Sequence, residues 1–189
     1  MKYADIYKFD ISNGPGIRVS LFVQGCPFHC KGCFNPETWD FHKGKEFTKD
    51  TLNYLLDLCS PDYISGLSIL GGEPLASTNI STVNEICARF KEKYPDKDIW
   101  IWTGFTMEVL NYYTTSIPNP LKTEYRYLLY GNSLTDADKF EEEVYNSKVS
   151  VIIDGQFEED KKDLSLLWRG SSNQRLWIRN KESGEWFVK

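Results

Sequence analysis

Three of the five cysteines of this chain lie in the stretch IRVSLFVQGCPFHCKGC, residues 17–33. Its first seven residues alternate in character and are rich in β-branched side chains, which is typical of a strand. The strand leads directly into Cys26, Cys30 and Cys33, which have the spacing C-x-x-x-C-x-x-C. Thiols spaced so closely behind a strand favour a metal or cluster site over a chance grouping.

The whole chain has the size and composition of one domain. Its 189 residues are 41% hydrophobic, and no linker, repeat or low-complexity tract divides them, so we expect a single domain over residues 1–189. The net charge of -5 argues against nucleic acid as a main partner, because phosphate binding needs a basic face.

The same composition bears on location. The N-terminus lacks the apolar segment of a secretory signal, and no run of about 18 apolar residues predicts a membrane span. We therefore expect no membrane partner and a cytoplasmic protein. In that compartment clustered cysteines are metal ligands more often than disulfides.

Other runs of β-branched and apolar residues predict strands that end at turns. They are residues 67–70 before Gly71-Gly72, 98–102 before Thr103-Gly104, 149–153 before Asp154-Gly155 and, more weakly, 125–130 before Gly131. Helical patterns lie between these runs, at residues 48–59 (with Thr48 as N-cap), 77–94, 106–113 and 135–145.

Strands that alternate with helices predict parallel β-α units. Sheets built from such units carry their chemistry at the carboxyl ends of the strands. We therefore expect the three cysteines to share one site with Gly71-Gly72-Glu73-Pro74, Trp102-Thr103-Gly104 and Asp154-Gly155.

Three clustered thiols suit two kinds of metal site. A structural zinc site is closed by four ligands, and His29, His42, Cys59 and Cys87 offer no fourth ligand at a supporting spacing. We interpret Cys59 and Cys87, on apolar helix faces, as core residues. A cubane 4Fe–4S cluster with three cysteines keeps one iron open, and an open coordination position marks a reactive site. On ligand count alone, zinc and iron–sulfur both remain open.

The motifs resemble a known superfamily and one of its branches. C-x-x-x-C-x-x-C at residues 26–33 resembles the signature of the radical S-adenosylmethionine (SAM) superfamily, and GGEP at 71–74 resembles its motif for the SAM amino group. NGPGIRVSLFVQGCPFHCKGCFNPETW (13–39), IWIWTGF (99–105) and VIIDGQFEEDKKDLSLLWRGSSNQR (151–175) are similar to blocks of the anaerobic ribonucleotide reductase activating enzymes. The last block is the most specific of these.

The resemblance implies a shortened, open (β/α) partial TIM barrel and a radical SAM activase. One 4Fe–4S cluster would be held by Cys26, Cys30 and Cys33, and SAM would chelate the fourth iron. Reductive cleavage of SAM would give a 5′-deoxyadenosyl radical, which generates a glycyl radical on an anaerobic ribonucleoside-triphosphate reductase. The implied partners are that reductase and a low-potential electron donor such as flavodoxin. The alternatives are activation of another glycyl-radical enzyme, such as pyruvate formate-lyase, and a non-catalytic zinc-binding module.

The resemblance also implies which residues contact SAM: Gly32, Cys33, Phe34, Gly71, Gly72 and Glu73. Many radical SAM enzymes have an aromatic residue before the third cysteine, whereas this chain resembles the activating enzymes in having Gly32 there and Phe34 just after it. Glu73 would accept a hydrogen bond from the methionine ammonium or orient the backbone. A valine at Gly72 should weaken SAM binding and leave the iron in place, because the cysteines lie on a different loop.

Two arginines in the specific block have an open role. Arg169 and Arg175 flank GSSNQ, residues 170–174. A solvated turn and a contact with a ligand or partner are both consistent with this pattern.

Overall fold

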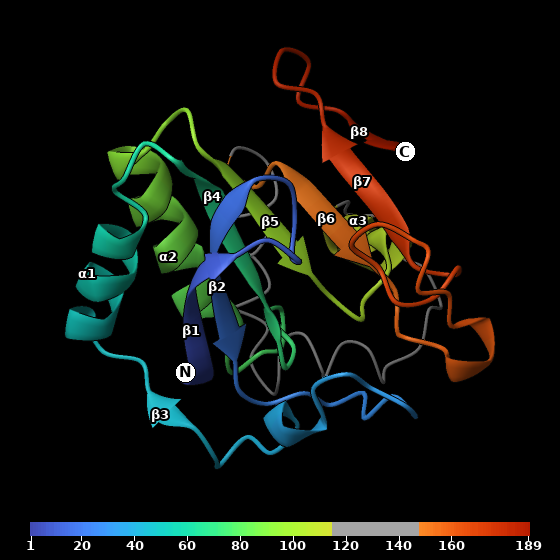
Figure 1. The fold of residues 1–189 in the computed structure, drawn as a ribbon. Coiled ribbons are helices and arrows are strands. Elements are labelled where there is room, and N and C mark those ends of the chain that lie inside the picture. The colour runs from blue at the N-terminus through green and yellow to red at the C-terminus, as the bar shows by residue number, and fades with distance from the viewer. Residues whose placement is uncertain (115–147) are drawn as a thin grey trace.

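The computed structural model describes residues 1–114 and 148–189, and Figure 1 shows a single open sheet with helices packed against it. Within these residues eight strands follow the order β3-β1-β2-β4-β5-β6-β7-β8. The strands are β1 (Lys2–Asp10), β2 (Ile17–Val23), β3 (Lys45–Glu46), β4 (Ile64–Gly71), β5 (Asp98–Trp102), β6 (Val151–Asp154), β7 (Arg175–Arg179) and β8 (Trp186–Val188). The helices are α1 (Lys49–Leu58), α2 (Ile80–Lys93) and α3 (Met107–Thr114), with 3-10 turns at Pro36–Thr38 and Glu159–Lys161.

The four central strands are parallel and neighbour one another in chain order. β2 pairs with β4, β4 with β5 and β5 with β6, each in parallel register. This confirms the prediction of an α/β protein with parallel β-α units. The outer strands β1, β3, β7 and β8 are antiparallel to their neighbours. The sheet is open, and the partial TIM barrel stays a prediction.

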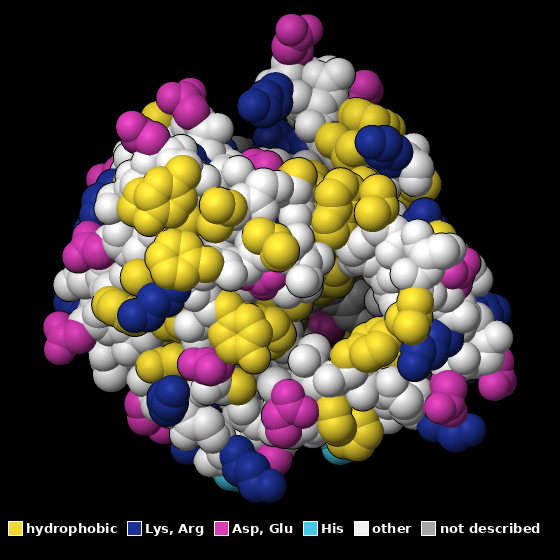
Figure 2. Space-filling model, in the orientation of Figure 1, with side chains coloured by type: hydrophobic (Ala, Val, Ile, Leu, Met, Phe, Trp, Pro, Cys, Tyr) yellow, Lys and Arg dark blue, Asp and Glu magenta, His cyan; other side chains and the backbone are white. Residues whose placement is uncertain are grey.

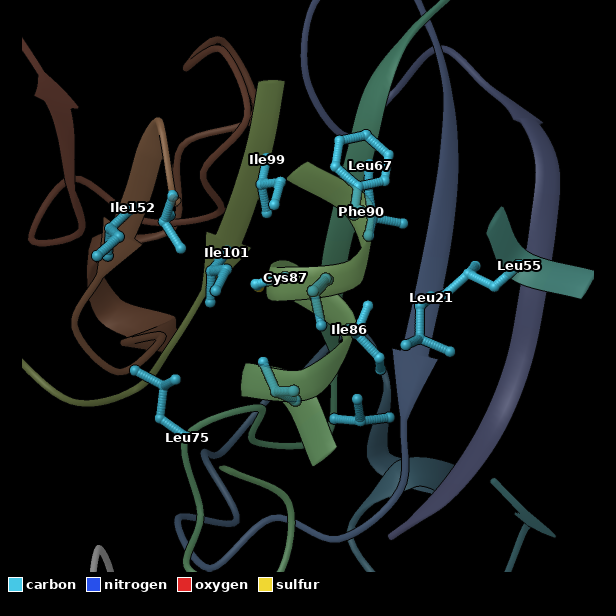
Figure 3. Packing of buried hydrophobic residues seen from close by; sticks show 14 of the residues in the cluster. Leu21, Leu55, Leu67, Leu75, Ile86, Cys87, Phe90, Ile99, Ile101 and Ile152 are labelled. Atoms are coloured by element: carbon cyan, nitrogen blue, oxygen red, sulfur yellow. The ribbon is translucent and has the colours of Figure 1, made fainter. Parts of the chain in front are cut away.

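The three helices cover one face of the sheet and form the main core. Thr48 caps α1 as predicted, because its side chain accepts a hydrogen bond from the Thr51 backbone at 3.2 Å. Cys59 and Cys87 are fully buried free cysteines, which confirms their interpretation as core residues. Figure 3 shows Cys87 among aliphatic side chains of the sheet and of α2. The core cluster joins Leu52, Leu55, Leu56, Val83, Ile86 and Phe90 to Leu21, Leu67, Ile69, Ile99, Ile101 and Ile152.

Helix α2 begins three residues later than its sequence pattern predicts. Asn79 precedes its first turn, and the Asn79 side chain donates hydrogen bonds to the carbonyls of Gln24 at 3.0 Å and Glu73 at 2.9 Å. The residues before Ile80 therefore connect the GGEP loop to the cysteine loop instead of extending the helix.

The opposite face of the sheet carries a buried charge. Arg18 is completely buried, pairs with Asp98 at 2.6 Å and donates to Ser68 Oγ at 2.7 Å. Ser68 Oγ donates in turn to the Asn13 carbonyl at 2.6 Å, which holds the loop between β1 and β2 against this face. A second apolar cluster, around Trp100 and Leu176, completes the face. Asn13 and Phe22, on this side of the sheet, line the cavity described below.

Four of the described strands, β1, β3, β7 and β8, were not predicted from the sequence. β1 carries Lys2, Asp5 and Lys8, which weaken its apolar pattern, and it forms by pairing with β2. β7 and β8 extend the sheet beyond β6 as an antiparallel hairpin. The predicted strand 125–130 and helix 135–145 lie outside the described residues. None of the described helices has the length and hydropathy needed to cross a membrane.

Candidate metal centre

The cysteine loop follows directly from β2 and is closed by hydrogen bonds to residues 37–40. The buried Gln24 side chain donates to the carbonyls of Glu37 at 3.0 Å and Asp40 at 2.9 Å. The backbone N–H of Gly25 donates to Thr38, and that of Cys26 donates to Trp39. Residues 37–40 therefore close the loop from behind and leave its three thiols facing the strand ends.

Backbone amides point at each of the three sulfurs. Burial raises the pKa of Cys26 to about 12, and the amides of Phe28 and His29 oppose that shift. Burial likewise raises the pKa of Cys30, and a hydrogen bond from the backbone amide of Phe157 opposes that shift. The Asn35 amide donates to Cys33 Sγ at 3.4 Å. Amide donors to sulfur stabilise a thiolate ligand and tune the potential of a bound cluster.

The GGEP loop packs directly on the cysteine loop. Gly72 N–H donates to the Val23 carbonyl at 2.9 Å, and Glu73 N–H donates to the Gly25 carbonyl at 2.7 Å. A Cβ at Gly72 would lie 2.5 Å from Gly25 O. The two loops are therefore in backbone contact, although the sequence prediction treated them as independent. The effect of a valine at Gly72 on the iron content stays a prediction.

A cavity of about 580 Å³ joins the predicted site segments. Its walls include Cys26, Cys30, Cys33, Gly71, Gly72, Glu73, Trp102, Thr103, Gly104, Gly155, Gln156 and Phe157. The prediction that the ends of the parallel strands meet in one site is thus confirmed. In Figure 1 the segments that follow β2 and β6 approach each other below the strand ends, and Figure 2 shows the hollow between them.

The three thiols suit a cluster better than a single metal ion. Within the described residues, no three Cys, His, Asp or Glu side chains converge on a point where one ion could be held. His29 is exposed and stacks on Trp39 at 4.8 Å. A cubane needs a different arrangement, in which each thiolate binds a separate iron around a cavity. Three separate sulfurs, each with an amide donor, around a space of this size fit that arrangement.

Comparison with known proteins agrees with this donor set. Residues 12–177 match the family described as "4Fe-4S single cluster domain". An anaerobic ribonucleoside-triphosphate reductase-activating protein of Enterobacteria phage T4 is 38% identical over 94% of both chains. Proteins of the same name from Escherichia coli K12 (34% identical, 92% of this chain and 96% of the relative) and Pasteurella multocida (35%, 94% and 97%) are similar over comparable lengths.

The chain belongs to the anaerobic ribonucleoside-triphosphate reductase-activating protein family. This membership confirms the resemblance read from the sequence motifs. The matched family also supports a 4Fe–4S cluster in this chain, and it weighs against the zinc-binding alternative.

Glu73 connects the GGEP loop to the loop after β5. Its carboxylate accepts hydrogen bonds from Leu75 N at 2.9 Å, Thr103 Oγ1 at 2.8 Å and Gly104 N at 2.7 Å. Burial raises the pKa of Glu73 to about 7, although these three donors lower it. Of the two roles considered for Glu73, this geometry favours orientation of the backbone, because both carboxylate oxygens are already engaged.

Two predicted SAM contacts differ in their placement. Phe34 lines the cavity, and its ring packs against Phe157 at 5.1 Å. Gly32 is exposed and is not part of the cavity wall; it faces Glu159 instead. Its positive φ of 74° turns the chain between Cys30 and Cys33. Gly32 therefore shapes the loop rather than facing the cavity.

The two arginines of the specific block have different roles. Arg175 pairs with the fully buried Asp154 and, at 2.6 Å, with Glu108, so it anchors the end of β6 to α3. Arg169 lines the cavity, where its Nη1 donates to the Gln174 carbonyl at 3.0 Å. The solvated-turn reading is wrong for Arg175, and Arg169 faces the site.

Several wall residues were not identified from the sequence. Phe28, Gln156 and Trp168 carry no motif of their own and reach the cavity through the fold. The one available signal was their position: Phe28 lies between two cysteines, and Gln156 follows the predicted strand end at Asp154-Gly155.

Proposed function

We propose that this chain activates an anaerobic ribonucleoside-triphosphate reductase by reductive cleavage of SAM at a 4Fe–4S cluster, which leaves a glycyl radical on the reductase. The observation that carries the proposal is the shared cavity, in which Cys26, Cys30 and Cys33 face the Gly71-Gly72 backbone. Membership of the activating-protein family supports the same conclusion and names the partner class.

Different residues would bind the cluster and SAM. Cys26, Cys30 and Cys33 would hold three irons and leave the fourth for the amino and carboxylate groups of SAM. When bound, the cluster supplies one electron that breaks a C–S bond of SAM, and the adenosyl fragment then takes a hydrogen atom from glycine. Gly71 and Gly72 let backbone approach the methionine part closely. No general base is needed in this scheme.

The rim of the cavity supports a protein substrate. Two large apolar side chains of the cavity wall are exposed, Phe34 at 53% and Leu164 at 76%, and the exposed Leu167 (69%) lies in the chain between the wall residues Leu166 and Trp168. Figure 2 shows hydrophobic side chains gathered around the hollow. Exposed apolar groups around a concave site are typical of an interface. A glycine-bearing segment of the reductase would bury them as it enters.

The remaining parts of the proposal concern partners and location. A low-potential donor such as flavodoxin would deliver the electron, and the reaction would take place in the cytoplasm. The relatives are named for ribonucleoside-triphosphate reductase, which favours that substrate over pyruvate formate-lyase.

The test is one anaerobic experiment with three readouts. Reconstituted protein is assayed for iron and sulfide, for methionine release from SAM with dithionite, and for a glycyl radical by electron paramagnetic resonance with the reductase or with pyruvate formate-lyase. We expect about four irons and four sulfides per chain, methionine release, and a radical on the reductase alone. Zinc without sulfide, or methionine release with a radical only on pyruvate formate-lyase, would refute the proposal.

A further inference from the structure

Gln156, which follows β6, reaches the sulfur of Cys30 on the loop that follows β2, although β4 and β5 lie between these two strands. Its side-chain Oε1 lies 4.0 Å from Cys30 Sγ, across 126 residues of sequence. Both residues line the cavity. Among the described residues, this is the one side-chain hydrogen-bonding group in contact with Cys26, Cys30 or Cys33; the other donors to these sulfurs are backbone amides.

The backbone that carries Gln156 is held from both sides. Gly155 N–H donates to the Phe105 carbonyl at 3.0 Å. The Gly155 carbonyl accepts from Gln174 Nε2 at 3.0 Å, and the Gln156 carbonyl accepts from Asn173 Nδ2 at 2.7 Å. Gly155 has a φ of 94°, which turns the chain from β6 toward the cysteine loop. With its backbone fixed, Gln156 keeps only its side-chain torsions.

The amide of Gln156 can serve either protonation state of Cys30. A neutral thiol donates to Oε1, as in this structure. A thiolate only accepts, so the same amide would turn its Nε2–H toward the sulfur. Phe157 N–H already donates to Cys30. A cluster thiolate at this position would thus receive two donors from consecutive residues.

Donors to sulfur matter most when the cluster gains negative charge. Reduction adds one electron, and a hydrogen bond to a ligand sulfur stabilises the more negative state. We propose that the Gln156 side-chain amide donates to the Cys30 thiolate of the assembled cluster and thereby raises the cluster's reduction potential. Gln156 would be a positioning and tuning residue that acts through Cys30. The inference rests on the cluster in the proposed function and is independent of SAM cleavage.

The experiment is a redox titration of the reconstituted cluster without SAM, monitored by electron paramagnetic resonance. Gln156→Leu keeps a similar size and removes the donor. At a fixed poise we expect its ratio of reduced to oxidised cluster to fall about threefold to tenfold, where tenfold is about 59 mV for one electron. For Gln156→Glu the ratio of reduced to oxidised cluster should fall further, because an ionised carboxylate adds negative charge beside the sulfur.

The control is Asn53→Ala. Asn53 is exposed on α1 and is not part of the cavity wall, so loss of its side-chain amide should leave the potential unchanged. If Gln156→Leu, with full iron content, titrates like the wild type, the inference is wrong. It is also wrong if Gln156→Leu and Asn53→Ala shift the potential equally.

A second measurement covers variants that fail to assemble a cluster. In wild-type protein labelled with 15N-glutamine, the reduced cluster should show a hyperfine coupling to a side-chain nitrogen that Gln156→Leu lacks. Absence of that coupling in the wild type overturns the inference, whatever the variants do. Neither measurement uses SAM or the reductase, so failure here is distinct from failure of the proposed function.

Discussion

The five cysteines of the chain divide into a loop set (Cys26, Cys30 and Cys33) and a core set (Cys59 and Cys87), which differ in the groups that surround their sulfurs. Cys26 on the loop and Cys59 and Cys87 in the core all have their pKa raised to about 12 by burial. Backbone amides oppose the shift at Cys26, whereas only the charges of lysines and Arg18 do so at Cys59, and only those of lysines at Cys87. The comparison teaches that directed N–H donors set the loop cysteines apart from the core cysteines, and that burial alone does not separate Cys26 from Cys59 and Cys87.

The strongest test replaces one cysteine of each set. Cys30→Ala should lose the cluster and all SAM cleavage, because three thiolates leave no spare ligand. Cys87→Ala should keep its iron and a rate within a few-fold, with a free energy of unfolding lower by about 1 kcal/mol for the small cavity. Iron analysis, methionine release and chemical denaturation measure these outcomes. Loss of iron in Cys87→Ala would erase the distinction between the two sets.

A second test asks how closely the loop cysteines depend on the neighbouring GGEP loop. Gly72→Val should lower both SAM binding and iron content several-fold, because its Cβ would lie 2.5 Å from Gly25 O beside Cys26. Gly184→Val is the control, since it has a φ of 76° and meets only the flexible end of Arg179. Iron retained in Gly72→Val would mean that the two loops move independently.

A third test concerns the Arg175–Asp154 ion pair, which lies at the start of the loop whose residues contact Cys30. Arg175→Met leaves the buried Asp154 carboxylate unpaired at the start of the Gly155–Phe157 loop. We expect a loss of about 2–4 kcal/mol in unfolding free energy and weaker iron retention. The full cost of breaking a buried pair is about 3–5 kcal/mol, but Arg175 is 32% exposed and partly screened.

The control for Arg175 is Arg89→Met. Arg89 pairs with Glu92 at 2.7 Å on the exposed side of α2, and removal should cost less than about 1 kcal/mol. Thermal and urea unfolding of the metal-free proteins compare the two. Equal losses in both variants would contradict a special role for the Asp154 pair.

The smallest expected effect is the pH dependence contributed by Glu73. Burial raises its pKa from the ordinary value of 4.5 to about 7, so the folded state holds this proton more tightly than the unfolded chain. Its contribution to stability therefore falls as the pH rises from 4.5 through 7. For metal-free protein we expect a decrease of about 1 kcal/mol between pH 6 and 7.

Glu73→Gln isolates that contribution, because it keeps the shape and removes the titration. The difference between wild type and variant, from urea unfolding at each pH, should show the decrease. A difference that is flat from pH 5 to 8, or that rises, would mean that the three donors to Glu73 outweigh its burial.

Sequence alone determined the candidate ligands and the order of the central elements. The spacing of Cys26, Cys30 and Cys33 and the Gly71-Gly72-Glu73 turn are local features, visible without the fold. Periodicity located the helix-covered core, including Cys59 and Cys87, because burial of one face imposes a repeat on the sequence. Parallel β-α units then predicted that the strand ends meet.

Tertiary structure decided what surrounds those ligands. Gln156 approaches Cys30, Gly72 contacts Gly25, and Glu73 bridges to Thr103 and Gly104, yet none of these pairs has a sequence pattern. The antiparallel strands β1 and β7 likewise form because a neighbour offers unpaired backbone groups, although Lys2, Lys8 and Arg175 dilute their apolar repeats. Hydrogen-bond direction and backbone contact between distant residues depend on three-dimensional placement, and a one-dimensional pattern carries no record of it.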